Sequence, residues 1–175
     1  GLGWTPLHLA CAKGNADVVR TLLAEGCEWG KKEKQIRASP LHVASCSSIA
    51  CVRELLDWRM GQGDKAEDVL VETVDRDGRT ALMYASMCGS LECAEYLIEK
   101  GGKRLILIEK RKGGDATWRV ETALMLACCE GRIEIVKLLL ERGGVEQIGR
   151  RYDDGWTLLM LASWQGRIEI VKLLL

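Results

Sequence analysis

Pairs of adjacent apolar residues recur four positions apart in three segments of the chain, and a basic residue follows the first pair each time. Residues i and i+4 lie on the same face of an α-helix, so each segment is predicted to be a helix that buries one apolar side. The pairs are Val18-Val19 with Leu22-Leu23, Ile135-Val136 with Leu139-Leu140, and Ile170-Val171 with Leu174-Leu175.

A six-residue box occurs five times along the chain, reading TPLHLA, SPLHVA, TALMYA, TALMLA and TLLMLA. Its first hydroxyl can cap a helix, and the proline of the first two boxes suits the first helical position, so the box predicts a second kind of short helix. The starts are separated by 34, 41, 42 and 35 residues, and such a period indicates stacked structural units. The boxes start at Thr5, Ser39, Thr80, Thr122 and Thr157.

These motifs resemble the ankyrin-repeat family, whose signature joins T-P-L-H-x-A to a period of about 33 residues. The resemblance covers essentially the whole chain, and the segment 131–140 recurs in register at 166–175. It implies an all-α fold: an ankyrin-repeat solenoid of about five helix-turn-helix units joined by β-hairpin loops. The Thr-Ala-Leu-Met wording of two later boxes is also similar to protist-type ankyrin arrays, some of which are linked to a kinase domain.

One ankyrin-repeat domain is expected over residues 1–175, with repeats at about 1–34, 35–60, 76–102, 118–144 and 153–175. Inserts at about 61–75 and 103–117 extend two loops. Their β-prone stretches, 69–74 in the first and 105–108 with 117–120 in the second, predict β-hairpin fingers. The chain starts on a box and stops inside a helix without polar capping repeats, so we expect it to be a fragment of a longer array.

The formal net charge is zero, which disfavours nucleic acid as a partner because no basic field covers the chain. No apolar run reaches the roughly 18 residues of a transmembrane segment, and no signal peptide is evident. The eight cysteines show no pattern of a secreted disulfide framework. We therefore expect reduced cysteines and an intracellular, cytoplasmic location.

The histidines and cysteines are the residues that could carry chemistry. His8 and His42 occupy the box position where the resemblance implies a structural histidine, and methionine replaces it in the later boxes. Cys46/Cys51 and Cys88/Cys93 share a five-residue separation that could suggest a metal site, but buried packing is favoured, with Cys88 as the expected exception. No phosphate loop, catalytic elbow or kinase motif is present. We therefore predict no enzyme activity and no catalytic, cofactor or metal site.

The resemblance implies that a partner would contact the hairpin tips and the inner face of each first helix. Tryptophan and arginine are enriched at interface hot spots, and four of the six tryptophans fall at these positions. Trp4 and Trp156 could instead pack locally against the hairpin stems. The predicted partner-binding residues are Trp4, Arg76, Arg79, Met87, Trp118, Arg119, Trp156, Trp164 and Gln165.

The favoured function is a protein–protein interaction scaffold or adaptor with a protein partner and no small-molecule substrate. One alternative is the targeting or regulatory arm of a larger enzyme such as a protein kinase. Another is binding of an anionic surface through the basic insert at 103–112, where five cations accompany Glu109. The simpler interpretation of this run is that its charges keep an apolar edge soluble.

Overall fold

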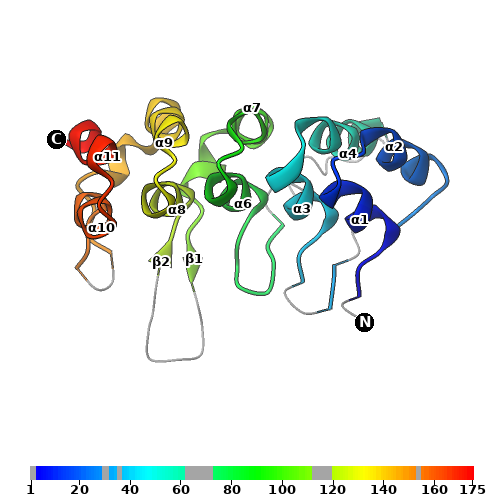
Figure 1. Ribbon diagram of the computed structural model, residues 1–175, viewed down its shortest axis with the longest axis horizontal. Helices are drawn as coiled ribbons and strands as arrows, with labels where there is room; N and C mark the ends of the chain where they lie inside the picture. Colours follow the sequence, from blue (N-terminus) through cyan, green and yellow to red (C-terminus); the bar gives the residue numbers. More distant parts are fainter. Residues whose placement is uncertain (1–2, 29–31, 35–36, 62–72, 112–119, 153–154) are drawn as a thin grey trace.

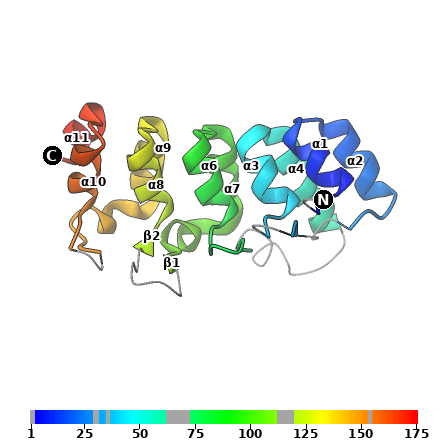
Figure 2. The ribbon, with the colours of Figure 1, turned by 60° about the horizontal axis from the view of Figure 1, so that its bottom comes forward.

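Helices stand in two rows along the molecule, and the loops project from one side of it (Figure 1). The computed structural model describes residues 3–28, 32–34, 37–61, 73–111, 120–152 and 155–175. Each inner helix lies beside an outer one, and the two termini are at opposite ends (Figure 2). This arrangement confirms the expected all-α solenoid of helix-turn-helix units.

The inner row holds the helices that begin at the boxes, and the outer row holds their partners. The inner helices are α1 (Pro6–Ala12), α3 (Pro40–Ser47), α6 (Ala81–Cys88), α8 (Ala123–Glu130) and α10 (Leu158–Trp164). The outer helices are α2 (Ala16–Ala24), α4 (Ile49–Gly61), α7 (Leu91–Leu107), α9 (Ile133–Leu139) and α11 (Ile168–Leu174).

The first box residue is the N-cap of each inner helix, as the sequence predicts. The hydroxyl oxygens of Thr80, Thr122 and Thr157 accept the backbone N–H three residues later, at 3.3, 3.2 and 3.3 Å. These bonds satisfy N–H groups that lack an intrahelical partner. At the other end, α6 and α8 stop at Gly89 and Gly131 with φ of 85° and 74°, a left-handed conformation that favours glycine.

The third residue of the first four boxes and the second residue of the last box are buried, and they belong to one apolar layer that runs through the stack. Outer-helix residues such as Val19, Leu97 and Leu139 close this layer from the other row. Each repeat therefore buries its apolar side against its neighbours, and the hydrophobic core extends along the whole stack of repeats. The box residues in the layer are Leu7, Leu41, Leu82, Leu124 and Leu158.

The predicted strand at 105–108 is wrong, because α7 continues to Leu107. Gly102, with φ 67° and ψ −173°, redirects the helix, and the next turn buries Leu105 and Ile106 completely. A run of four apolar residues cannot distinguish a buried strand from a buried helical turn by periodicity. The hairpin of this insert begins later, where β1 (Lys110–Arg111) pairs antiparallel with β2 (Val120–Glu121).

In repeat four the outer helix also changes direction, next to the position that corresponds to Gly102 of repeat three. The π-helical turn η1 (Leu140–Gly144) contains Gly143 at φ 125°, and the 3-10 turn η2 (Val145–Gln147) follows it. The first insert falls largely on residues 62–72, and the predicted strand at 69–74 is therefore mostly outside the described residues, apart from a single antiparallel bridge between Val74 and Thr80. Among the described residues, no helix combines the length and the apolar composition that a membrane-spanning helix requires.

Candidate protein-binding surface

The solvent side of the inner row carries a line of mostly apolar side chains, which we call the inner stripe. They are the fifth and eighth residues counted from each box start, one helical turn apart and hence on the same face. Each keeps at least part of its surface exposed, whereas Leu161 at the fifth position of the last repeat is buried. The inner stripe comprises Leu9, Ala12, Val43, Cys46, Tyr84, Met87, Leu126, Cys129 and Trp164.

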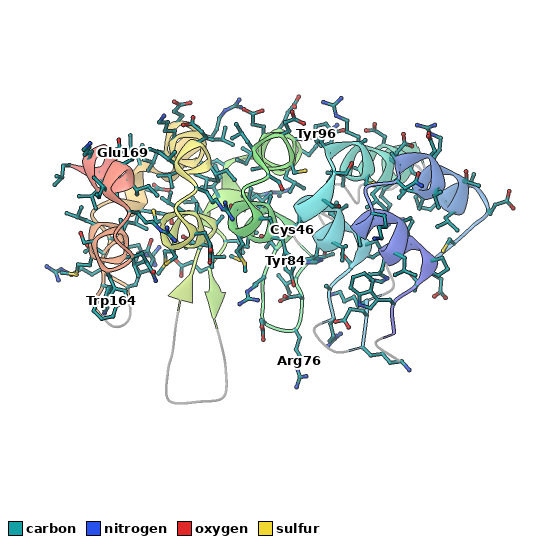
Figure 3. The ribbon with its side chains drawn as sticks, viewed as in Figure 1. Cys46, Arg76, Tyr84, Tyr96, Trp164 and Glu169 are labelled. Carbon is teal, nitrogen blue, oxygen red and sulfur yellow. A yellow bond between two sulfur atoms is a disulfide. The ribbon has the colours of Figure 1, made fainter. Side chains whose placement is uncertain are left out.

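Trp164 ends the inner stripe and is 77% exposed, more than any other aromatic side chain in the described ranges. Its ring lies edge-to-face against Trp156, with centroids 6.0 Å apart and planes at 89°. Trp156 is half-buried and packs against the core, so it supports Trp164 from behind. Figure 3 shows Trp164 at the end of α10, on the side from which the loops project. The structure thus brings two of the predicted residues together.

The hairpin before repeat three is held by Asp75, which is buried. Its Oδ1 accepts the backbone N–H groups of Asp77 and Arg79, both at 2.8 Å, and its Oδ2 accepts the hydroxyl of Tyr84 at 2.8 Å. Burial, and then this hydrogen bond to Asp75, raise the pKa of the Tyr84 phenol above its ordinary range. A side chain of the inner stripe is therefore tied directly to a hairpin.

The two predicted arginines of this hairpin differ in availability. Arg76 is exposed and points away from the helices (Figure 3). Arg79 is half-buried, its guanidinium lies 3.7 Å from Asp77 Oδ2, and its carbonyl accepts a bond from His42. Arg79 is thus part of the hairpin framework, whereas Arg76 is presented to solvent.

The other predicted residues lie at different points of the surface. Trp4 is 41% exposed and its ring sits 5.9 Å from that of His8. Met87 is half-buried within the inner stripe, and Gln165 is exposed beside Trp164. Trp118 and Arg119 lie outside the described residues. The sequence missed Leu9, which is 57% exposed, although its place in the box could have indicated it.

His8 and His42 link neighbouring repeats. The Nδ1 atoms accept backbone N–H groups of the capping residues Thr5 and Ser39, at 3.2 and 3.1 Å. The proton therefore sits on Nε2, which donates to the carbonyls of Ala38 and Arg79, at 3.1 and 3.0 Å. Both rings are fully buried, and burial lowers the pKa of His42. These histidines hold neighbouring repeats together, as their position in the box predicts.

The later repeats use other side chains for the same purpose. Gln147 is buried, and it occupies the position in repeat four that Leu105 occupies in repeat three. Its Oε1 accepts hydrogen bonds from the hydroxyls of Thr122 and Tyr152, at 2.9 and 3.3 Å. Its Nε2 donates to the carbonyl of Ile106 at 3.3 Å. This one amide therefore joins the cap of α8 to both of the bent segments.

Two arginines reach back to the preceding repeat. Arg132 Nε donates to the carbonyl of Met87 at 3.1 Å, and Arg167 Nε donates to that of Cys129 at 3.0 Å. The side chain of Arg132 lies over Gly89, where a Cβ atom would stand only 3.1 Å from it. The turn glycine therefore also leaves room for the arginine of the next repeat.

The expectation that all cysteines are reduced is wrong for one pair, because Cys46 and Cys88 form a disulfide with Cα atoms 5.3 Å apart. Sequence reasoning missed it because the bond joins two repeats, although Cys46 and Cys88 are the eighth and ninth residues counted from their box starts. Cys51 and Cys93 are buried free thiols, as the packing interpretation predicts. Across the described residues no cluster of three or more potential metal ligands was found.

The basic insert does not present one continuous cationic surface in its described part. Lys103 and Arg104 lie near the end of α7, where Lys103 is 3.8 Å from Glu146 and Arg104 Nε donates to the backbone carbonyl of Gly101. Glu109 forms an ion pair with Arg150. Charges of both signs therefore alternate around the base of this insert.

Comparison with known proteins identifies the class. The family described as "Ankyrin repeats (3 copies)" matches residues 7–105 and 103–175, so the chain belongs to the ankyrin-repeat family. The crystal structure of the human ASB11 ankyrin repeat domain aligns with a TM-score of 0.74 and 26% identity, over 98% of this chain and 68% of that one. Ankyrin repeats generally serve as protein-interaction modules without enzymatic activity.

Two curated relatives match about half of the chain. Ankyrin repeat domain-containing protein 37 of Xenopus tropicalis is 32% identical over 97 residues, which are 55% of this chain and 53% of that protein. Alpha-latrotoxin-Lg1a of Latrodectus geometricus is 29% identical over 101 residues, 57% of this chain and 7% of the toxin. The chain thus spans about half of one relative's length and a small part of the other's.

Proposed function

We propose that this chain is a non-enzymatic scaffold or adaptor that binds a protein partner along the inner stripe and the adjoining hairpins. The observation that carries the proposal is Trp164, a large aromatic side chain left 77% exposed on a rigid helix and braced by a second tryptophan. Exposed aromatic surface of this kind marks interaction sites, and tryptophan is the residue most enriched among interface hot spots.

The proposed contacts continue from Trp164 along the inner stripe toward the earlier repeats. Gln165 adjoins it at the end of α10, and Met87 contributes to the middle of the inner stripe. Arg76 and Trp4 offer exposed side chains near the loops, so a partner seated on the stripe could reach them. Arg79, Trp118, Arg119 and Trp156 complete the proposed set.

A capture experiment tests the proposal with matched variants. The purified chain, Trp164→Ala and Val18→Ala are immobilised, and proteins retained from a lysate are compared by quantitative mass spectrometry. Val18 is an exposed apolar residue of the outer row, so its variant controls for loss of apolar surface elsewhere. We expect a partner that wild type and Val18→Ala retain equally and that Trp164→Ala binds about tenfold more weakly or worse. Equal retention by all three would contradict the proposal.

The anionic-surface alternative has less support, because cations of the insert's described part alternate with Glu109 and lie near Glu146. Binding through phosphates or lipid headgroups would weaken steeply with added salt. Binding through the inner stripe depends mainly on apolar contact, so a shallow salt dependence of the captured complex favours the proposed function.

A further inference from the structure

The disulfide between Cys46 and Cys88 joins two repeats within the proposed binding surface. Cys46 belongs to the inner stripe near the end of α3, and Cys88 is the last residue of α6. Figure 3 shows Cys46 between these two helices, on the same side as Tyr84. Because the helices pack against each other in successive repeats, two residues 42 positions apart meet at the surface.

The two bonded cysteines differ from the four core cysteines in their access to solvent, while Cys27 and Cys129 are half-buried free thiols. Cys88 is exposed and Cys46 is half-buried, whereas Cys11, Cys51, Cys93 and Cys128 are buried in the core. Burial raises the pKa of the Cys11 and Cys128 thiols to about 12 and that of Cys93 to about 11, and it also raises that of Cys51. Because the thiolate is the reactive form, these four are protected from exchange at neutral pH.

The contacts around the bond allow it to open without unfolding the repeats. Ser90 Oγ donates to the carbonyl of Cys46 at 3.3 Å, and Ser47 Oγ donates to that of Cys11 at 2.5 Å. The buried His42 tie to the Arg79 carbonyl also joins repeats two and three. None of these hydrogen bonds uses a sulfur atom of the disulfide, so reduction of the sulfur–sulfur bond does not itself break them.

We propose that Cys46 and Cys88 form a reversible oxidation site that responds to small-molecule thiols and disulfides of the glutathione type. A thiolate attacks the exposed Cys88 Sγ, forms a mixed disulfide, and releases Cys46 as a thiolate that takes up a proton. A second thiolate attacks the sulfur of the bound small molecule, so the small-molecule disulfide leaves and Cys88 becomes a thiol after protonation. In sum, two thiols are oxidised to one disulfide while the Cys46–Cys88 bond gains two electrons and two protons.

The oxidation state changes the inner stripe at its middle. In the oxidised form the ends of α3 and α6 are covalently held, so the surface between Val43 and Met87 is preorganised for a partner. Reduction replaces this bridge with two separate thiols and restores freedom to both helix ends. A preorganised surface loses less entropy on binding, so we expect the oxidised form to bind a partner about threefold to tenfold more tightly. This consequence rests on the proposed function, whereas the oxidation site itself does not.

The site is tested first without any partner. The folded chain is equilibrated in buffers of reduced and oxidised glutathione, quenched with acid, alkylated, and mapped by mass spectrometry, with circular dichroism recorded in parallel. We expect Cys46 and Cys88 to change together between disulfide and alkylated thiol while the helical signal stays constant. Cys11, Cys51, Cys93 and Cys128 should be labelled only after denaturant is added. Reduction of the pair only upon unfolding, or no bond in oxidising buffer, would overturn the site.

The effect on binding is measured with the partner recovered by the capture experiment. Wild type, the double variant Cys46→Ser/Cys88→Ser and the control Cys27→Ser are each compared in oxidised and reduced glutathione. Wild type and Cys27→Ser should lose affinity on reduction, and the double variant should not respond. If reduction leaves wild-type affinity unchanged while Trp164→Ala lowers it, the redox effect is wrong and the proposed function stands. If neither changes the affinity, both are wrong.

Discussion

The first two repeats and the last two have the same fold but are tied to their neighbours by different side chains. In the first half, His8 and His42 reach forward to carbonyls of the following hairpin. In the second half, methionine replaces the box histidine, and Arg132 and Arg167 reach back to the preceding inner helix. The ankyrin stack therefore needs a polar link between adjacent repeats, while the residue that supplies it can change.

The histidine and arginine hydrogen bonds between repeats use side chains other than those of the proposed binding surface. The histidine ties are buried and depend on a neutral ring, whereas the arginine ties lie near the surface over the turn glycines. Both kinds hold backbone carbonyls of one repeat against the next. Neither uses the side chain of Trp164, which is 77% exposed.

The largest effect is expected in the apolar layer, which the two halves share. Leu41→Ala and Leu124→Ala each remove a fully buried side chain, so both should lower the free energy of unfolding by about 2–5 kcal/mol. Urea unfolding followed by circular dichroism measures the two values. A loss confined to one half would show that the repeats differ in their core as well as in their ties.

Loss of a histidine hydrogen bond between repeats should have the second-largest effect on stability. His42→Met introduces the residue that the later boxes carry, but it leaves the Arg79 carbonyl and the Ser39 N–H without their partner. We expect a loss of about 1–3 kcal/mol in the free energy of unfolding, since unpaired buried polar groups are costly. The control Met83→Leu keeps the volume of a buried box position and should cost less than about 1.5 kcal/mol. Equal losses would contradict the role of the tie.

The arginine ties should contribute less, because they are more exposed to water. Arg132→Met removes one hydrogen bond to the Met87 carbonyl while keeping much of the side chain's length. The expected loss is about 0.5–1.5 kcal/mol, measured by thermal unfolding. Lys137→Met is a suitable control, because Lys137 pairs with Glu134 on its own helix, and such surface pairs contribute little. A larger loss from the control would refute this assignment.

The smallest expected effect is the pH dependence that His42 gives to the stability of the fold. Burial lowers the pKa of His42 below its ordinary value of 6.5, so the folded chain binds this proton less readily than the unfolded chain does. His42 therefore favours folding above pH 6.5, and this contribution is lost as the pH falls below 6.5 toward the folded pKa. Between about pH 7 and 5, wild type should lose more stability than His42→Met. Parallel pH profiles of the melting temperature would exclude this linkage.

The sequence predicted the parts of the fold that depend on local chemistry. The box threonines, Gly89 and Leu124 perform the capping, turning and packing roles that their positions indicate. The bent end of α7 could not be predicted, because the apolar run at 105–108 fits a strand as well as a helical turn. Gln147 gave no signal either, since its partners come from three other segments of the chain.

The candidate surface was less predictable than the fold. The tryptophans could be placed from the repeat register, but whether Trp156 braces Trp164 depends on packing between a loop and a helix. The Cys46–Cys88 bond depends on the contact between two repeats, and no spacing within one repeat reveals it. The partner-binding role of the nine residues remains a prediction.

The central claim is that the ties build the stack and the inner stripe binds the partner, and one paired measurement tests it directly. Partner affinity and melting temperature are determined together for Trp164→Ala and His42→Met. The account predicts that Trp164→Ala binds at least about tenfold more weakly with little change in melting temperature. His42→Met should melt at a lower temperature and, where folded, bind normally. A lower melting temperature with unchanged affinity for Trp164→Ala would contradict the account.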